Sequence, residues 1–229
     1  MQDENYSEPL FNRLPPAVVA LALAIFAVEV LLGLGARGIL GGAEGIGWRS
    51  TALRDFAFYP EIVPWMIERG TFPVELLKRF VTYSFVHWSF TQTIFVIVFL
   101  LALGKLVGEV FGNLAVLILF FACGIFGAFV FAGLTGSDRP LAGGFPSVYG
   151  LIGAYTFLQW VGYGAIGENQ YRAFTLIGFL LGIQLVFGVI FGASSDWIAE
   201  LAGFALGFLL TPALAPGAFA RFLHRMRNR

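Results

Sequence analysis

The chain has 229 residues, of which 58% are hydrophobic and 12% are charged, and its formal net charge is zero. This composition excludes an ordinary soluble domain, and the balanced charge gives no indication of nucleic-acid binding. The sequence instead predicts an all-α integral membrane protein.

Six charge-poor segments are long enough to cross the membrane, because a hydrocarbon core of roughly 30 Å needs about 20 apolar residues of helix. They lie at residues 15–36, 84–105, 112–135, 145–166, 173–194 and 197–216. The connection between the first two, residues 37–83, mixes aromatic residues, prolines and charges, which predicts an interfacial loop. We therefore expect one six-helix membrane domain over residues 15–216, without internal repeats.

Two polar ends flank this domain. Residues 1–14 are acidic and polar, without the features of a cleavable signal peptide. Residues 217–229 carry Arg221, Arg225, Arg227 and Arg229. By the positive-inside rule this tail predicts a cytoplasmic C-terminus, and six spans then place the N-terminus in the cytoplasm too. The 37–83 loop is also basic, but a long loop is translocated largely regardless of its charge.

Small residues recur four positions apart in the last two predicted spans. The sets are Gly178 with Gly182, Gly188 with Gly192, and Ala199 with Gly203 and Gly207. This spacing places small residues on one helix face and allows helix backbones to approach closely. We therefore predict that these helices pack against one another. Cys123, the single cysteine, has apolar neighbours and is predicted to be a small packed side chain rather than a reactive thiol.

Polar side chains within the predicted spans are few, and each is a functional candidate because polar groups are costly in the membrane. They are Glu29, His87, Gln92, Tyr149, Gln184 and Glu200. Glu29 lies midway along the first span, where a carboxylate without a partner favours its protonated form. Two roles stay open for Glu29: a structural hydrogen bond, or a partner-linked or proton-linked function.

The stretch PLAGGFPSVYGLIGAYTF, residues 140–157, leads into the fourth span with two glycines, a proline and Ser147. A serine nucleophile needs a general base, usually a histidine, within hydrogen-bonding reach. The chain has two histidines, and His224 lies in the basic tail, on the opposite side of the membrane in the predicted topology. His87, on the outer side, is therefore the only histidine that could serve Ser147.

Four segments resemble the rhomboid intramembrane serine proteases, in the order expected of that family's six-helix core. They are RFVTYSFVHWSFTQTIFV (79–96), LGKLVGEVFG (103–112), GGFPSVYGLIGA (143–154) and SDWIAELAGFALGF (195–208). The likeness covers about residues 15–215 and retains family scaffold positions at Arg79, Thr82, His87, Gly143, Tyr149, Gly153, Ala199, Gly203 and Gly207. Of these, Gly143, Gly153, Ala199, Gly203 and Gly207 are the helix-packing positions. The resemblance implies a six-helix rhomboid fold, and we expect it in the bacterial inner (plasma) membrane.

The chemical positions of the family are changed. With Tyr149 and Gly153 aligned, Phe145 falls on the nucleophile position and Pro146 on the last glycine of the family's Gly-x-Ser-Gly motif. Glu200 falls on the position of the histidine base. Ser147 lies two residues past the nucleophile position, which rotates its side chain by about 200° on a helix.

The family's two oxyanion positions are occupied by Gln92 and Val96, and His87 matches an earlier histidine of the same motif. Glu109 lies one place later than the family spacing, which leaves its role open. The resemblance therefore implies a rhomboid-like pseudoprotease that lacks the serine and histidine dyad.

Phe145 would fill the family's water-accessible cavity with apolar bulk, and Pro146 would remove a backbone N–H that could bind an oxyanion. We predict a hydrogen-bonded cluster of Gln92, Tyr149 and Glu200 that joins the second, fourth and sixth spans. The alternative is that Glu200 is solvated near the outer interface.

Two functions fit this interpretation. Inactive rhomboids generally bind transmembrane segments of other membrane proteins, here through the old substrate gate between spans two and five, and affect the assembly or stability of those proteins. The alternative is a fixed accessory subunit of a larger membrane complex. Either function implies other integral membrane proteins and the lipid bilayer as partners, with no cofactor, metal or nucleic acid.

Two further alternatives receive less support. One is a protease with Ser147 as a displaced nucleophile and His87 or Glu200 as base, although a carboxylate is a poor base for a serine at neutral pH. The other is a transporter that carries protons on Glu29 and Glu200, although the sequence has no visible inverted repeat.

Overall fold

The computed structural model describes residues 14–136, 139–191 and 194–214. Within these residues the regular secondary structure is helical, and a single isolated bridge pairs Phe58 with Leu141. Nearly all of the predicted N-terminal segment 1–14 and the whole basic tail 217–229 lie outside the described residues, so the predicted sides of both termini stay predictions.

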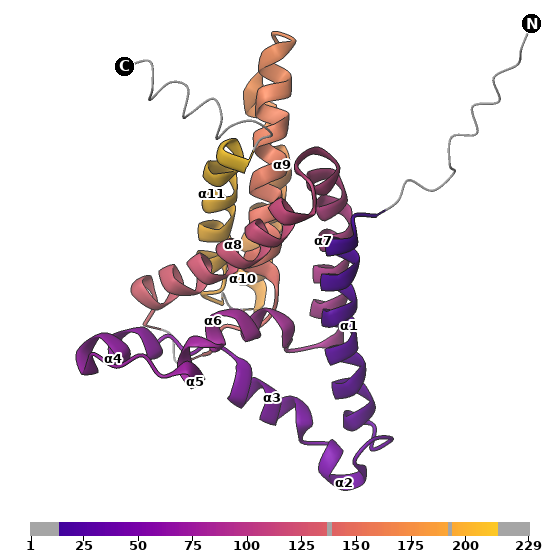
Figure 1. Ribbon diagram of the computed structural model, residues 1–229, viewed down its shortest axis with the longest axis vertical. Coiled ribbons are helices and arrows are strands. Elements are labelled where there is room, and N and C mark those ends of the chain that lie inside the picture. Colours follow the sequence, from indigo (N-terminus) through magenta and orange to yellow (C-terminus); the bar gives the residue numbers. More distant parts are fainter. Residues whose placement is uncertain (1–13, 137–138, 192–193, 215–229) are drawn as a thin grey trace, which may run out of the picture.

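Six long helices form the bundle in Figure 1. They are α1 (Pro16–Ala36), α7 (Phe90–Phe111), α8 (Asn113–Leu134), α9 (Phe145–Ala165), α10 (Thr175–Phe191) and α11 (Trp197–Leu214). A 3₁₀ helix, η2 (Gln170–Phe174), precedes α10.

Among the described residues, four of these helices are long and apolar enough to cross a membrane: α1, α7, α8 and α11. Helix α9 has 21 residues, but its tyrosines, Ser147, Thr156 and Gln159 make it less apolar than those four. Helix α10 has only 17 residues. The expectation of an all-α integral membrane protein is therefore confirmed, whereas the count of six spans stays a prediction.

The helix predicted at residues 84–105 is displaced along the chain, because α7 begins at Phe90 and ends at Phe111. Residues Tyr83–Phe85 form a 3₁₀ helix, η1, and Ser89 is the N-cap, accepting a hydrogen bond from the Gln92 backbone N–H at 3.2 Å. An N-cap serine fixes where a helix starts, and this one leaves His87 on the loop before α7.

The 37–83 connection is largely helical. It holds α2 (Gly42–Gly45), α3 (Trp48–Phe56), α4 (Ile62–Arg69), α5 (Val74–Leu77) and α6 (Arg79–Thr82). Figure 1 shows these short helices together at the end of the bundle where α1 ends. Several apolar side chains of this connection are exposed, including Trp65, Ile67, Phe72 and Val74, as expected of a segment lying at a membrane interface.

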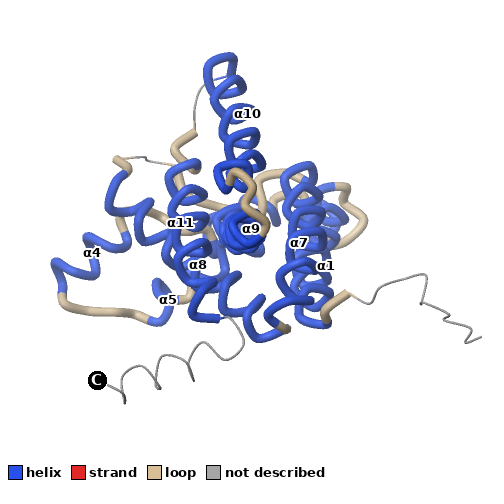
Figure 2. Tube along the Cα trace, turned by 90° about the horizontal axis from the view of Figure 1, so that it is seen from above, coloured by secondary structure: helices blue, strands red, loops and turns tan. Residues whose placement is uncertain are grey.

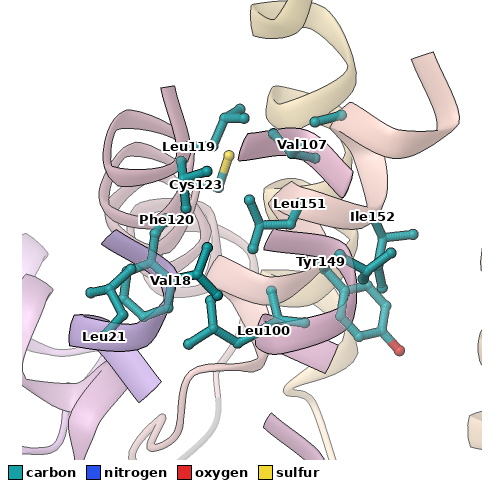
Figure 3. Close-up of a cluster of buried hydrophobic side chains, with 14 of the residues drawn as sticks. Val18, Leu21, Leu100, Val107, Leu119, Phe120, Cys123, Tyr149, Leu151 and Ile152 are labelled. Carbon is teal, nitrogen blue, oxygen red and sulfur yellow. The ribbon is translucent and has the colours of Figure 1, made fainter. Parts of the chain in front are cut away.

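The largest core cluster joins α1, α7, α8 and α9, and Figure 3 shows Val18, Leu100, Phe120 and Leu151 from these four helices together. Cys123 lies in this cluster and is fully buried, as the sequence predicted, facing Gly150 of α9. A buried thiol packed against a glycine behaves as a small apolar side chain.

Glycines distinguish the packing of α11 from that of α10. A Cβ atom at Gly203 or Gly207 would collide with the carbonyl oxygens of Pro146 and Gly150 on α9, so α11 and α9 approach at backbone distance. A Cβ at Gly178 or Gly182 on α10 would have no atom of the described chain within 4 Å. The predicted close packing at Gly178 and Gly182 is therefore wrong. The surroundings of Gly188 and Gly192 lie outside what the structure describes.

Candidate functional site: the converging ends of α7, α9 and α11

The starts of α7, α9 and α11 converge at one end of the bundle, together with the loop that carries His87. Gly143 lies just before α9 and has φ +107°, and a Cβ there would lie 2.6 Å from the Gln92 Nε2 atom. Only glycine fits both that backbone conformation and that space. On α11, the Ala199 carbonyl lies so close to Gly127 of α8 that a Cβ at Gly127 would be 2.7 Å from it.

Phe145 is the first residue of α9, and its side chain is half-buried. Its ring meets the Tyr149 ring edge-on, with the centroids 6.4 Å apart. Edge-to-face contacts of this kind stabilise aromatic pairs. The position that the sequence alignment predicts for the family's nucleophile therefore carries a hydrocarbon ring packed on Tyr149.

Ser147 faces a different part of the molecule. It is fully buried against Gly124 of α8, and its Oγ lies 3.5 Å from the Ser84 Oγ. Beside it, the Tyr83 hydroxyl donates to the Gly124 carbonyl at 2.7 Å. Among the described residues neither His87 nor Glu200 hydrogen-bonds to Ser147, so this serine has no general base in contact.

His87 and Gln92 bind the backbone that leads into α9. The Gly144 N–H donates to the His87 Nε2 at 3.2 Å. The Gln92 Nε2 donates to the Ala142 carbonyl at 3.1 Å, and its Oε1 accepts from the Trp88 N–H at 2.8 Å. Val96 is fully buried and has no donor to offer. Both ends of the Gln92 amide are thus occupied by the protein itself.

Glu200 lies in the first turn of α11 and is 5% exposed, so within the folded chain it is not the solvated carboxylate of the alternative interpretation. It accepts a hydrogen bond from the Gln184 Nε2 on α10, and the Tyr149 hydroxyl lies within hydrogen-bonding reach of it. The expected trio is found with Gln184 in place of Gln92, because Gln92 is already bound to Trp88 and Ala142.

The sequence indicates that Gln184 is a polar residue in an apolar span, but it does not indicate which residue Gln184 hydrogen-bonds to. The available signal was the scarcity of such residues, because polar side chains in a membrane tend to pair across helices.

A family model for the rhomboid domain matches residues 75–217, more than half of the chain. The chain belongs to the rhomboid family. Among curated proteins no match to it is found. The matched residues include every part of the site from Arg79 to Gly207, whereas α1 and α3 lie outside them.

The second buried carboxylate of this rhomboid-family chain, Glu29 on α1, lies in that unmatched part and is 3% exposed. Arg49 of α3 donates to its two oxygens at 2.5 and 3.1 Å, and the Thr93 hydroxyl donates at 2.8 Å. The Arg49 guanidinium also donates to the His87 carbonyl at 2.8 Å. Glu29 therefore has a cationic partner that ties the interfacial loop to α1 and to the site.

Two further charged side chains, Arg139 and Asp196, lie on the loops before α9 and α11. The Arg139 guanidinium lies over the Trp88 ring, 4.6 Å from its centroid, a cation–π arrangement. Burial raises the pKa of Asp196, just before α11, while Arg139 acts in the opposite direction. These residues bring together the loops before α7, α9 and α11.

At the far end of α7, Glu109 lies 3.9 Å from Lys105 as a half-exposed ion pair. Among the described residues no group of three or more His, Cys, Asp or Glu side chains is arranged to hold a metal ion.

Proposed function

We propose that this chain is a non-catalytic rhomboid-family protein that binds transmembrane segments of other membrane proteins and affects their assembly or stability. One argument carries the first half of the proposal: the alignment with the family motifs puts Phe145 at the nucleophile position, while Ser147, two residues later, is buried against α8 with no general base bound to it among the described residues. Without an activated nucleophile, acyl transfer has no first step.

The surroundings of Phe145 support the same conclusion. Pro146 has no N–H to offer an oxyanion, and the Gln92 amide is bound to Trp88 and Ala142. At the base position, Glu200 is a carboxylate, whose reference pKa near 4 makes it a weak base for a hydroxyl.

Binding of membrane segments is supported by the exposed apolar surface beside the site. Beyond Leu181, the α10 side chains of Ile183, Leu185, Val186, Val189 and Ile190 are exposed. Figure 2 shows α10 extending away from the other long helices. A partner helix could lie against this surface without displacing any packed core.

Serine-directed labelling tests the loss of catalysis. We expect no labelling of the purified protein by a fluorophosphonate probe, at any concentration that labels an active rhomboid protease in the same detergent. Labelling of the wild-type protein that disappears in Ser147→Ala would overturn the proposal and restore the displaced-nucleophile alternative.

A fixed accessory subunit is the second candidate, and the open face at Gly178 and Gly182 favours it, because nothing in the described chain covers these glycines. Affinity purification in mild detergent followed by mass spectrometry separates the two candidates. Varied partners below one equivalent support transient binding of membrane segments. A single partner that stays stoichiometric through size exclusion supports the subunit.

We also propose the bacterial inner membrane as the location, with both termini in the cytoplasm, on the strength of the basic tail. Fusing alkaline phosphatase to the C-terminus tests the orientation. The proposal predicts an inactive fusion, and an active one would contradict it.

A further inference from the structure

Glu200 is a buried carboxylate whose hydrogen-bond partners are neutral groups. These partners are the Gln184 amide and the Tyr149 hydroxyl, and no Lys, Arg or His of the described chain forms an ion pair with it. The charged group that acts on Glu200, Asp196, is also a carboxylate. An ionised carboxylate away from water is stabilised far better by a cation than by neutral donors. Within the described residues, Glu200 therefore lacks the cation that would stabilise its ionised form.

The contact that covers Glu200 is itself incomplete. Gln184 donates its amide N–H to Glu200, while its Oε1 is buried and has no hydrogen-bond partner among the residues that the structure describes. A buried acceptor left unpaired weakens the arrangement that contains it. Gln184 is therefore a partner that a better donor can replace.

Helix α10 is attached to the bundle in a way that permits this replacement. Its first half packs on the core through Leu176, Ile177 and Leu180, and its second half exposes apolar side chains from Ile183 onward. Within that half, and among the side chains that the structure describes, Gln184 is half-buried and reaches α11. For these described side chains, moving this half of α10 would break one hydrogen bond and little apolar packing.

We propose that Glu200 recognises a membrane segment carrying a lysine or arginine, which enters beside α10, displaces Gln184 and pairs with the carboxylate. This inference rests on the proposed function and names the chemistry of the partner. The charge is complementary, and the cation lies within the outer turn of the segment, because Glu200 lies in the first turn of α11. An ammonium group supplies three donors, more than the Gln184 amide provides.

The test uses the full-length protein in lipid nanodiscs and fluorescent single-span peptides of Leu and Ala. Three peptides differ at one position, one helical turn inside the outer end, which is Lys, Leu or Glu. We expect the Lys peptide to bind about tenfold more tightly than the Leu peptide, and the Glu peptide to bind most weakly.

Glu200→Gln should remove the preference for Lys by lowering the affinity for the Lys peptide to that for the Leu peptide. Glu168→Gln is the matched control, because Glu168 is an exposed carboxylate, paired with Arg172 at 3.3 Å, and it should keep the preference. Gln184→Leu removes the competing donor and should raise the affinity for the Lys peptide several-fold.

Equal binding of the Lys and Leu peptides to the wild-type protein would overturn this inference and leave segment binding intact. Failure to bind any of the peptides would contradict both proposals. If Glu200→Gln does not fold, Gln184→Leu decides: tighter binding of the Lys peptide supports the inference, and unchanged binding overturns it.

Discussion

Glu29 and Glu200 are both buried carboxylates on long helices, but their partners differ in charge and in origin. Glu29 is held by the Arg49 guanidinium and the Thr93 hydroxyl. Glu200 is held by the neutral Gln184 amide, from a helix whose outer half is exposed. Removing the cation of a buried ion pair destabilises a fold, whereas a buried carboxylate without a cation in the protein is a candidate for binding.

The largest expected effect comes from removing the cation at Glu29. Arg49→Met should lower the free energy of unfolding by about 3–5 kcal/mol, because it leaves a buried carboxylate unpaired. The control is Arg54→Met on the same helix, where the ion pair with Asp55 is exposed and the change should stay within about 0.5 kcal/mol. Chemical denaturation in detergent measures both. Equal losses would show that Glu29 does not depend on its cation.

A hydroxyl comparison sharpens the same point. Thr93→Val removes a 2.8 Å hydrogen bond to Glu29 and should lower stability by roughly 1.5–3 kcal/mol. Thr156→Val is the matched variant, because the Thr156 hydroxyl is fully buried and has no hydrogen-bond partner in the part of the chain that the structure describes. Its loss should be neutral or stabilising. If chemical denaturation shows that Thr156→Val is less stable than Thr93→Val, the assigned hydrogen bonds are wrong.

Helices α11 and α10, which are joined by the hydrogen bond between Glu200 and Gln184, can be compared through their glycines. Gly207→Ala would push a Cβ into the Gly150 carbonyl and should lower stability by about 1–3 kcal/mol. Gly178→Ala enters open space and should be neutral or stabilising by up to about 1 kcal/mol, since alanine is the better helix former. A loss at Gly178 measured for the monomeric protein would mean that α10 packs more closely than described.

The smallest effect is expected at an ordinary surface carboxylate. Glu168 pairs with Arg172 four residues later, and both side chains are more than half exposed. Glu168→Gln should change stability by no more than about 0.5 kcal/mol, the usual range for exposed ion pairs. A larger loss in the same denaturation series would remove the distinction between buried and exposed carboxylates.

The sequence predicted an all-α membrane protein correctly, because apolar character is a local property of each segment, but among the described helices four are long and apolar enough to span a membrane. It misplaced the start of α7, because the 3₁₀ turn at Tyr83–Phe85 and the Ser89 cap interrupt a continuous apolar run. A local pattern of small residues also cannot show whether another helix packs against it. The sequence therefore predicts close packing at both Gly178 and Gly203.

The candidate site was predicted only in part for the same reason. The changed positions Phe145 and Glu200 follow from the alignment with the family motifs. Arg49 and Gln184 could not be assigned, because each meets its carboxylate across elements distant in the sequence, and only the three-dimensional packing brings them together.

The separation of roles between the two carboxylates is tested most directly by thermal unfolding of Glu29→Gln and Glu200→Gln, side by side in one detergent. Glu29→Gln should lower the midpoint by about 4–12 °C, from a loss of roughly 2–3 kcal/mol at a buried charged hydrogen-bond network. Glu200→Gln should change it by no more than about 2 °C, because an amide oxygen still accepts from Gln184. An equal or larger fall for Glu200→Gln would contradict the account and make Glu200 a structural residue like Glu29.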